Sequence, residues 1–382
     1  MAKIAAGGLR SLGENELIDR IRLIRSPNVG PVTFHKLIMR FGDAGAALDA
    51  LPDLARRGGL ARPFRIAGRD VAEREVETAD RAGCRLIASC ETDYPSALRT
   101  IDSAPPIITI KGDASLFAKP STAIVGSRNA SIAGCKIAGM LARGIGEAGF
   151  SVTSGLARGI DAAAHEASVP TGTIAVLAGG LDRPYPPQNI PLMNRIAETG
   201  IVLSETPFGH EPRARDFPRR NRIIAGISLG LVVVEAAKRS GSLISARLAG
   251  DYGRLVFAVP GSPLDPRAKG TNDLIRDGAI LAAEPGHVVS AIDPLVCVPE
   301  EFNFQADDQL GEPAAAPPPA DADRERIAGL MGPTPIAIDD IIRHAGVAAS
   351  QVQMVLLELD LAGRIERHAG GTVSLAMPCS SG

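Results

Sequence analysis

The regular alternation of short apolar runs and helical segments between residues 122 and 259 is the feature that most restricts the fold. Strands are expected at 122–126, 150–154, 173–178, 200–204, 230–235 and 254–259, and helices near 131–148, 160–168, 188–198, 219–228 and 241–252. A helix near 70–82 and strands at 84–88 and 107–110 precede them. Short Val/Ile/Leu strands that are bounded by glycine and alternate with helices are typical of a parallel sheet covered on both faces. The sequence therefore predicts an α/β domain with a doubly wound, Rossmann-like parallel sheet.

The chain of 382 residues is long enough for two or three domains. We expect a helical module at 1–82, the α/β domain at 83–298, a proline-rich and acidic linker at 299–320, and a small domain at 321–377. In the first part, helical patterns at 14–26 and 32–41 flank a Pro-Asn-Val-Gly-Pro turn. This arrangement resembles the helix-hairpin-helix of non-specific DNA binders, whose turn amides contact a phosphate. A plain helical hairpin is the alternative.

The last part has the pattern of a winged-helix domain. Helices are expected near 322–331, 337–345 and 350–362, followed by a hairpin of 364–367 and 372–376. The helix that would read DNA, residues 350–361, contains no lysine or arginine. Because a helix in a DNA groove faces an anionic duplex, we expect this domain to contact protein or to act as a spacer.

Charge is distributed unevenly along the chain. The formal net charge is −2, but residues 290–382 contain 5 Lys/Arg and 14 Asp/Glu, whereas residues 1–289 contain 36 Lys/Arg and 29 Asp/Glu. A basic body with an acidic tail is compatible with binding of a polyanion by the body. The aromatic share of 3% argues against a site built mainly from stacked rings.

The cysteines and the apolar stretches indicate where the chain resides. Five scattered cysteines without a Cys-x-x-Cys motif are typical of reduced thiols in a cytosol. We find no signal sequence, and the longest charge-free apolar stretch, near 223–234, is too short to cross a bilayer. We therefore expect a cytoplasmic protein without a membrane segment.

Five segments next to the expected strands could bind phosphate. Four are glycine-rich turns, which contain Gly126-Ser127-Arg128, Gly155 with Arg158-Gly159, Gly179-Gly180-Leu181, and Lys238 with Ser240-Gly241-Ser242. Such turns gather at the carboxyl edge of a doubly wound sheet, where backbone amides at a helix start, hydroxyls and guanidinium groups can converge on an anion. The alternative is that the glycines serve the geometry of the turns alone.

The fifth segment is the densest basic run, Phe217-Pro218-Arg219-Arg220-Asn221-Arg222, which Arg213 and Arg215 precede. A solvated surface is the usual reason for such a run. Here the run continues directly into an apolar helix, which favours a functional role, with Phe217 as a platform on which a base could stack.

Catalytic motifs are missing from the sequence. We find no zinc-protease, deaminase, nucleophile-elbow, P-loop or dinucleotide motif, and we expect no catalytic residue, metal or cofactor. Asp161 and His165 lie one turn apart on a helix, although Asp161 is better placed as a cap. The competing hypothesis is a nucleotide-binding sensor or nucleotide-hydrolysing enzyme, with Glu205 and Glu235 as its acids. A transcription factor that uses the winged helix is a third and weaker possibility.

Ordered motifs across about 150 residues resemble the bacterial DNA-processing protein family DprA, also called Smf. The motifs are Ile-Val-Gly-Ser-Arg at 124–128, Ser-Gly-Leu-Ala-Arg-Gly-Ile-Asp-Ala at 154–162, Tyr-Pro at 185–186, Leu-Ser-Glu at 203–205, Phe-Pro-Arg-Arg-Asn-Arg-Ile-Ile-Ala-Gly at 217–226, Ser-Gly-Ser-Leu-Ile at 240–244, Val-Pro-Gly at 259–261 and Gly-Thr-Asn at 270–272. The helical module, which is SAM-like in this family, and the winged-helix tail are similar too.

The resemblance implies a non-catalytic homodimer that binds incoming single-stranded DNA during natural transformation, protects it and loads the RecA recombinase. Members often carry a lysine shortly before the phenylalanine, where this chain has Arg213 and Arg215. Together, the turns and the resemblance predict DNA contacts from Gly126, Ser127, Arg128, Gly155, Arg158, Gly159, Arg213, Arg215, Phe217, Arg219, Arg220, Asn221, Arg222, Lys238, Ser240, Gly241 and Ser242.

Overall fold

The computed structural model describes residues 11–296, 318–368 and 370–376. Most of the expected linker at 299–320, residues 1–10 of the expected helical module and residue 377 lie outside these ranges. The described residues form two compact units. The α/β unit contains residues 11–12 and 73–296, and the second unit contains residues 13–72 together with 318–376.

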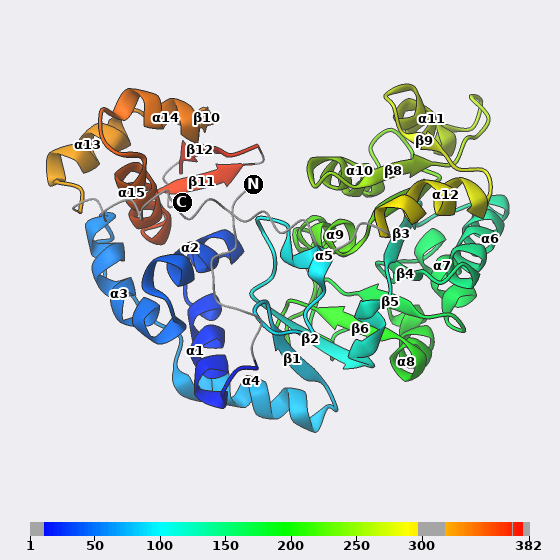
Figure 1. Ribbon diagram of the computed structural model, residues 1–382, viewed down its shortest axis with the longest axis horizontal. Helices are drawn as coiled ribbons and strands as arrows, with labels where there is room; N and C mark the ends of the chain where they lie inside the picture. Colours follow the sequence, from blue (N-terminus) through cyan, green and yellow to red (C-terminus); the bar gives the residue numbers. More distant parts are fainter. Residues whose placement is uncertain (1–10, 297–317, 369, 377–382) are drawn as a thin grey trace, which may run out of the picture. The chain divides into compact units, whose positions relative to one another are not determined.

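A nine-stranded sheet forms the centre of the α/β unit (Figure 1). Its strands are β1 (Arg85–Ala88), β2 (Ile107–Gly112), β3 (Ser121–Gly126), β4 (Ser151–Ser154), β5 (Thr173–Val176), β6 (Ile201–Ser204), β7 (Gly230–Val234), β8 (Leu255–Ala258) and β9 (Ile280–Leu281), in the order β1-β2-β6-β5-β4-β3-β7-β8-β9. Only β2 runs antiparallel to its neighbours. The connections proceed outward from β3 in one direction and from β7 in the other, so the doubly wound, Rossmann-like fold is confirmed, with its switch point between β3 and β7.

Helices cover both faces of this sheet. The helices are α4 (Arg69–Arg81), α5 (Ser96–Arg99), α6 (Ile132–Glu147), α7 (Ile160–Ser168), α8 (Ile190–Thr199), α9 (Asp216–Ile227), α10 (Gly241–Asp251), α11 (Lys269–Arg276) and α12 (Pro285–Val296), with short 3-10 helices at Ala114–Ala118, Pro187–Asn189 and Pro266–Ala268. One apolar core lies between the sheet and α5, α9 and α10, and another lies between the sheet and α6, α7 and α12. Because both faces are buried, the central strands consist almost entirely of buried residues.

The second unit combines a helical module with a winged-helix domain. The helical module, residues 13–72, contains α1 (Glu14–Arg25), α2 (Pro31–Phe41) and α3 (Ala44–Arg57). The winged-helix domain, described from residue 318 to 376, contains α13 (Asp321–Gly329), β10 (Ile336–Ala337), α14 (Ile338–Ala345), α15 (Ala349–Leu361), β11 (Ile365–His368) and β12 (Thr372–Leu375). Its three strands pair antiparallel in the order β10-β12-β11.

Local chemistry explains where the helices of the helical module begin and end. Gly42 has a φ of +85° and follows the last residue of α2. Asp43 then caps α3, because its carboxylate accepts a hydrogen bond of 2.8 Å from the amide of Ala46. α3, which contains Pro52, is not among the helices expected from the sequence.

Candidate nucleic-acid interface

The turns that the sequence predicts to bind phosphate lie at the carboxyl edge of the sheet, next to the switch point. Gly126-Ser127-Arg128 follows β3, the Gly155–Gly159 turn follows β4, and Ser240-Gly241-Ser242 leads from β7 into α10. Arg128, Arg158 and Phe217 line one small pocket together with Gly155, Ala157, Tyr185 and Pro186. Residues from four separate connections therefore meet at one place, as ligand-binding groups do in open α/β sheets.

A cation and two aromatic rings form the most distinctive part of this pocket. The guanidinium carbon of Arg128 lies 4.8 Å from the centre of the Phe217 ring. The Tyr185 ring approaches the same phenylalanine edge to face, with 5.7 Å between the ring centres. Arg128 is exposed and Tyr185 keeps half of its surface exposed, so both remain accessible to a ligand. The predicted contacts omit Tyr185, although it belongs to the Tyr-Pro motif.

At three of the predicted glycines, other atoms of the chain approach too closely to leave room for a side chain. The geometry of the turns alone therefore accounts for these glycines, as the alternative in the sequence analysis holds. A Cβ at Gly126 would collide with the carbonyl oxygen of Val234, one at Gly155 with the guanidinium of Arg220, and one at Gly159 with the carbonyl oxygen of Ser127. Gly159 also has a φ of +75°, which other residues adopt at a cost. Gly241 differs, because a Cβ there would meet nothing within 4 Å.

Groups of the chain itself occupy part of the helix start after Arg128, where backbone amides are expected to meet an anion. The Ser131 hydroxyl caps α6 by accepting a hydrogen bond of 2.9 Å from the amide of Gly134. The Glu235 carboxylate accepts hydrogen bonds from both the amide and the hydroxyl of Ser131. A carboxylate of the chain thus occupies the helix start at which a Rossmann fold receives a pyrophosphate.

Arg220 does not face the surface, in contrast to the prediction of a DNA contact there. Its guanidinium donates hydrogen bonds to the carbonyl oxygens of Gly155 and Val176, and the residue is 5% exposed. Burial lowers the pKa of Arg220 to about 10, so it stays charged at neutral pH. Burial raises the pKa of the neighbouring Asp161, whose carboxylate accepts hydrogen bonds from the amides of Gly155 and Ala157. We correct the role of Arg220 to positioning of the Gly155–Gly159 turn.

Arg222 is buried as well, so we correct its predicted DNA contact to a structural role. Its guanidinium donates to the carbonyl oxygen of Ser103 and to the carboxylate of Glu205. Glu205 also pairs with the exposed Arg219 at 3.3 Å. Glu205 and Glu235, the candidate acids of the competing enzyme hypothesis, are therefore both occupied by neighbouring groups of the chain.

The remaining cations of the prediction are exposed. They are Arg128, Arg158, Arg213, Arg215, Arg219 and Lys238. Among the residues that the structure describes, only Arg219 of this set forms an ion pair. Asn221 connects the basic run to the Ser240 turn, because its amide donates to the carbonyl oxygen of Gly241 at 3.4 Å. Ser240 and Ser242 hydrogen-bond to each other at 2.7 Å, and the Ser127 hydroxyl accepts from the amide of Asn129.

Neither a metal-binding cluster nor a membrane span is found within the described residues. Within residues 11–296, 318–368 and 370–376, no group of three or more His, Cys, Asp or Glu side chains could hold a metal ion. No helix in the same ranges has both the length and the apolar composition that a membrane span requires.

Three models of one protein family match the helical, α/β and winged-helix parts of the chain. Residues 85–293 match the model of DNA recombination-mediator protein A, residues 14–78 match a DprA-like N-terminal HHH domain, and residues 311–371 match a DprA winged helix domain. Protein Smf of Escherichia coli (strain K12) is 37% identical over 300 residues, which cover 77% of this chain and 78% of that protein.

Two solved structures are similar to this chain. DNA processing protein A from Streptococcus pneumoniae aligns with a TM-score of 0.60 and 33% identity, over 74% of this chain and 98% of that one. DNA processing protein A from Helicobacter pylori aligns with a TM-score of 0.51 and 28% identity, over 55% of this chain and 96% of that one. Since the three family models cover the helical, α/β and winged-helix parts in order, the chain belongs to the DprA (Smf) family of DNA recombination-mediator proteins.

Proposed function

We propose that the carboxyl edge of the α/β unit binds single-stranded DNA. The observation that carries this proposal is the Arg128 guanidinium stacked on Phe217, at a pocket that Arg158 also lines. Exposed cations attract the phosphates, and exposed rings offer a face on which a base stacks whatever its identity. The H. pylori relative supports the proposal, because its structure is described as showing a single-stranded DNA binding mode.

The buried groups give this surface its shape. Arg220 and Asp161 hold the turn after β4 through its carbonyl and amide groups. Arg222 and Glu205 hold the start of α9, and thereby Phe217, against the body of the unit. In this proposal Arg128, Arg158, Arg213, Arg215, Arg219, Lys238 and the Ser240–Ser242 turn contact the backbone, and Phe217 and Tyr185 contact the bases.

Replacement of Arg128 tests the proposal. We expect Arg128→Ala to weaken binding of a fluorescent oligo-dT at least tenfold, which corresponds to about 1.4 kcal/mol or more, because a phosphate contact and one side of the Phe217 stack are lost together. Fluorescence anisotropy measures the affinity, and circular dichroism verifies the fold.

Arg143→Ala is the matched control. Arg143 is an exposed arginine in the second half of α6, which lies toward the opposite edge of the sheet because α6 runs back from the end of β3. Equal affinities of Arg128→Ala and Arg143→Ala would contradict the proposed site.

We further propose that the protein is a non-catalytic, dimeric mediator that protects incoming single-stranded DNA and loads RecA on it during natural transformation. Family membership supports this role, and the pairing of Glu205 and Glu235 with neighbouring groups supports the absence of catalysis. Nuclease protection and RecA filament assembly on single-stranded DNA should both require Arg128. Release of base or phosphate from added nucleotides would favour the nucleotide-hydrolysing alternative.

A further inference from the structure

The helix α15, which occupies the position of a DNA-reading helix in the winged-helix domain, is covered along two faces. Val352, Val355, Leu356 and Leu359 lie in the core of the winged-helix domain itself. Met354, Leu357 and Leu361 lie in a second core, which they share with Phe34 and Leu37 of α2 and with Leu51 and Leu54 of α3. The helical module therefore seals the face of α15 that the winged-helix domain leaves uncovered.

Polar contacts place the end of α15 on the start of α2. The Thr33 hydroxyl, in the first turn of α2, donates a hydrogen bond of 2.7 Å to the carboxylate of Asp360, and Thr33 is 3% exposed. One turn further, the Lys36 ammonium donates to the side-chain oxygen of Gln353 at 2.8 Å. The side-chain amide of Asn28, in the hairpin turn, donates to the carbonyl oxygen of Leu361 at 2.9 Å.

The start of α2 is the place at which a helix-hairpin-helix meets a DNA phosphate. Here an anion of the chain already occupies it, since the Asp360 carboxylate lies against the first turn of α2 and pairs with Arg367 at 2.8 Å. Lys36 lies beside both charges, and burial followed by the proximity of Arg367 lowers its pKa to about 8. A phosphate that approached this turn would meet the carboxylate and the covering helix.

The charges of the two parts are complementary. Residues 13–72 contain ten Lys/Arg and seven Asp/Glu, and residues 318–376 contain five Lys/Arg and eight Asp/Glu. The helical module is thus net positive and the winged-helix domain net negative by the same amount. An acidic domain packed on a basic one is the arrangement expected if the acidic domain takes the place of a bound polyanion such as a nucleic acid.

We propose that the winged-helix domain competes with nucleic acid for the helical module, with Asp360 in the place of a backbone phosphate. In the docked state this chain binds DNA through the carboxyl edge of the α/β unit alone. Undocking frees the hairpin turn and the start of α2, which then form a second, sequence-independent DNA-binding surface. This inference concerns a different surface from the proposed single-strand site and does not depend on it.

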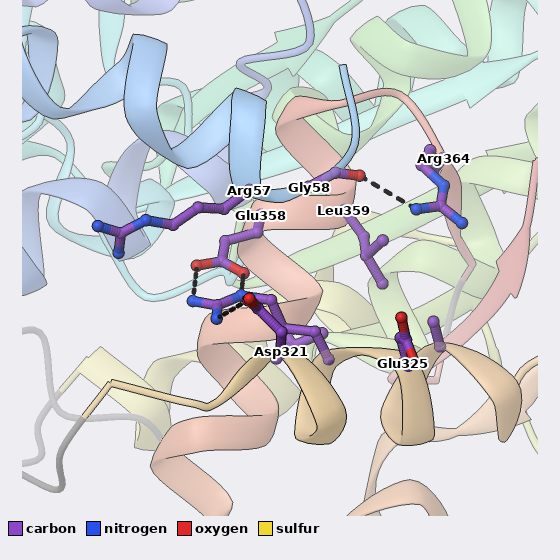
Figure 2. A pocket seen from close by; sticks show the side chains of 10 residues that line it. Arg57, Gly58, Asp321, Glu325, Glu358, Leu359 and Arg364 are labelled. Atoms are coloured by element: carbon purple, nitrogen blue, oxygen red, sulfur yellow. Dashed lines mark hydrogen bonds and ion pairs between the residues drawn. The ribbon is translucent and has the colours of Figure 1, made fainter. Parts of the chain in front are cut away.

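A pocket lies at one side of the docked surface (Figure 2). It has a volume of about 400 Å³ and is lined by Arg57, Asp321, Arg324, Glu325, Glu358 and Arg364 among others. Arg324 holds Glu358 through two hydrogen bonds of 2.8 and 3.0 Å, and both residues belong to the winged-helix domain. A hydrogen bond of 3.3 Å from Arg364 to the carbonyl oxygen of Gly58 crosses this side, where Gly58 also packs against α15.

We expect Gly58→Ala to separate the helical module from the winged-helix domain. Gly58 follows the last residue of α3 with a φ of −68°, a conformation that alanine adopts without strain, yet its added Cβ would collide with the carbonyl oxygen of Glu358 in α15. Gly329→Ala is the matched control, because Gly329 is an exposed glycine of the winged-helix domain whose added Cβ would meet nothing within 4 Å. Thr33→Val is a second, milder variant that keeps the side-chain shape and removes the bond to Asp360.

The experiment uses the full chain in an Arg128→Ala background, in which the proposed single-strand site is weakened. Hydrogen exchange of residues 28–36 and 352–361 reports docking, and anisotropy with labelled single- and double-stranded oligonucleotides reports binding. We expect Gly58→Ala to accelerate exchange in both segments and to raise DNA affinity at least fivefold, Thr33→Val to act in the same direction, and Gly329→Ala to change neither.

Faster exchange without a gain in affinity would overturn the proposal, and so would unchanged exchange in both Gly58→Ala and Thr33→Val. If Gly58→Ala loses its helical circular dichroism signal, the exchange and affinity of Thr33→Val alone decide whether the proposal holds. Arg128→Ala alone, without a second substitution, tests the single-strand site. If it does not weaken DNA binding, that result counts against the single-strand site, and the comparison of Gly58→Ala, Thr33→Val and Gly329→Ala still tests the docking proposal.

Discussion

Arginines of one short segment differ sharply in burial in the α/β unit. The side chain of Arg219 is 57% exposed, whereas that of Arg222 is 9% exposed and Arg220 as a whole is 5% exposed. A buried guanidinium is stable only where acceptors surround it, and both buried arginines have backbone carbonyl partners. The residue type therefore predicts a positive charge. The hydrogen-bond acceptors around the guanidinium decide whether it stays exposed to a ligand or is buried in a structural hydrogen bond.

His165 gives the α/β unit a pH dependence at the residue scale. It is fully buried, and its Nδ1 lies 2.7 Å from the Thr173 hydroxyl. Burial, followed by the nearby Arg220, lowers its pKa to about 3. Because the unfolded chain takes up the proton near pH 6.5 and the folded chain does not, stability is complete above that pH and is lost as the pH falls toward 3.

We expect the free energy of unfolding to fall by about 2 kcal/mol more in the wild type than in His165→Gln between pH 7.5 and pH 5. Urea denaturation followed by circular dichroism at the two pH values measures the difference. Equal decreases in the two proteins would show that His165 titrates normally in the folded chain.

At the scale of elements, the turns after β3 and β4 depend on each other. The amide of Ile160, at the start of α7, donates to the carbonyl oxygen of Ser127 at 3.2 Å. This close approach needs a residue without a Cβ at Gly159, which also has a positive φ. The glycine spacing in the sequence thus indicates where the connections are, and the packing of one connection on another explains why glycine is needed.

Gly159→Ala should therefore destabilise the α/β unit by about 2–4 kcal/mol, from backbone strain and from the collision with Ser127. Gly241→Ala, in another turn of the same edge, should change stability by less than about 0.5 kcal/mol, since a Cβ there has open space. Denaturant unfolding compares the two variants. Similar stabilities would mean that the turns are not packed as described.

Elements with strong local patterns were predicted to within a few residues. The expected strand at 230–235 is observed as Gly230–Val234, and the expected helix at 14–26 as Glu14–Arg25. Two helices that contain an internal proline are not expected from the sequence. They are α3, with Pro52, and α12, with Pro294. Proline usually ends a helix, and the surrounding core compensates for it here through buried neighbours such as Leu51, Leu54 and Ile292.

At the scale of the whole molecule, the small net charge conceals the cations that the fold gathers at one edge. Of the cations predicted to contact DNA, five are exposed and form no ion pair with another described residue: Arg128, Arg158, Arg213, Arg215 and Lys238. If each of these cations neutralises one phosphate, binding of single-stranded DNA releases counterions in proportion, and affinity falls steeply with salt.

We expect the logarithm of the affinity for oligo-dT to fall with the logarithm of the salt concentration with a slope of about −3 to −4, and the slope of Arg128→Ala to be smaller in magnitude by about 0.7. Anisotropy titrations between low and moderate salt give both slopes. A slope near zero in the wild type would contradict a phosphate-directed surface.

The sequence by itself determined the fold class, because hydrophobic periodicity and turn chemistry act over a few residues and recur regularly along the chain. It also indicated which loops carry cations. Only the tertiary structure decided that Arg220 and Arg222 point inward, that Glu235 occupies the start of α6, and that Thr33 meets Asp360 across 327 residues of sequence. The physical reason is that burial and pairing depend on groups from distant segments, whose approach no local pattern records.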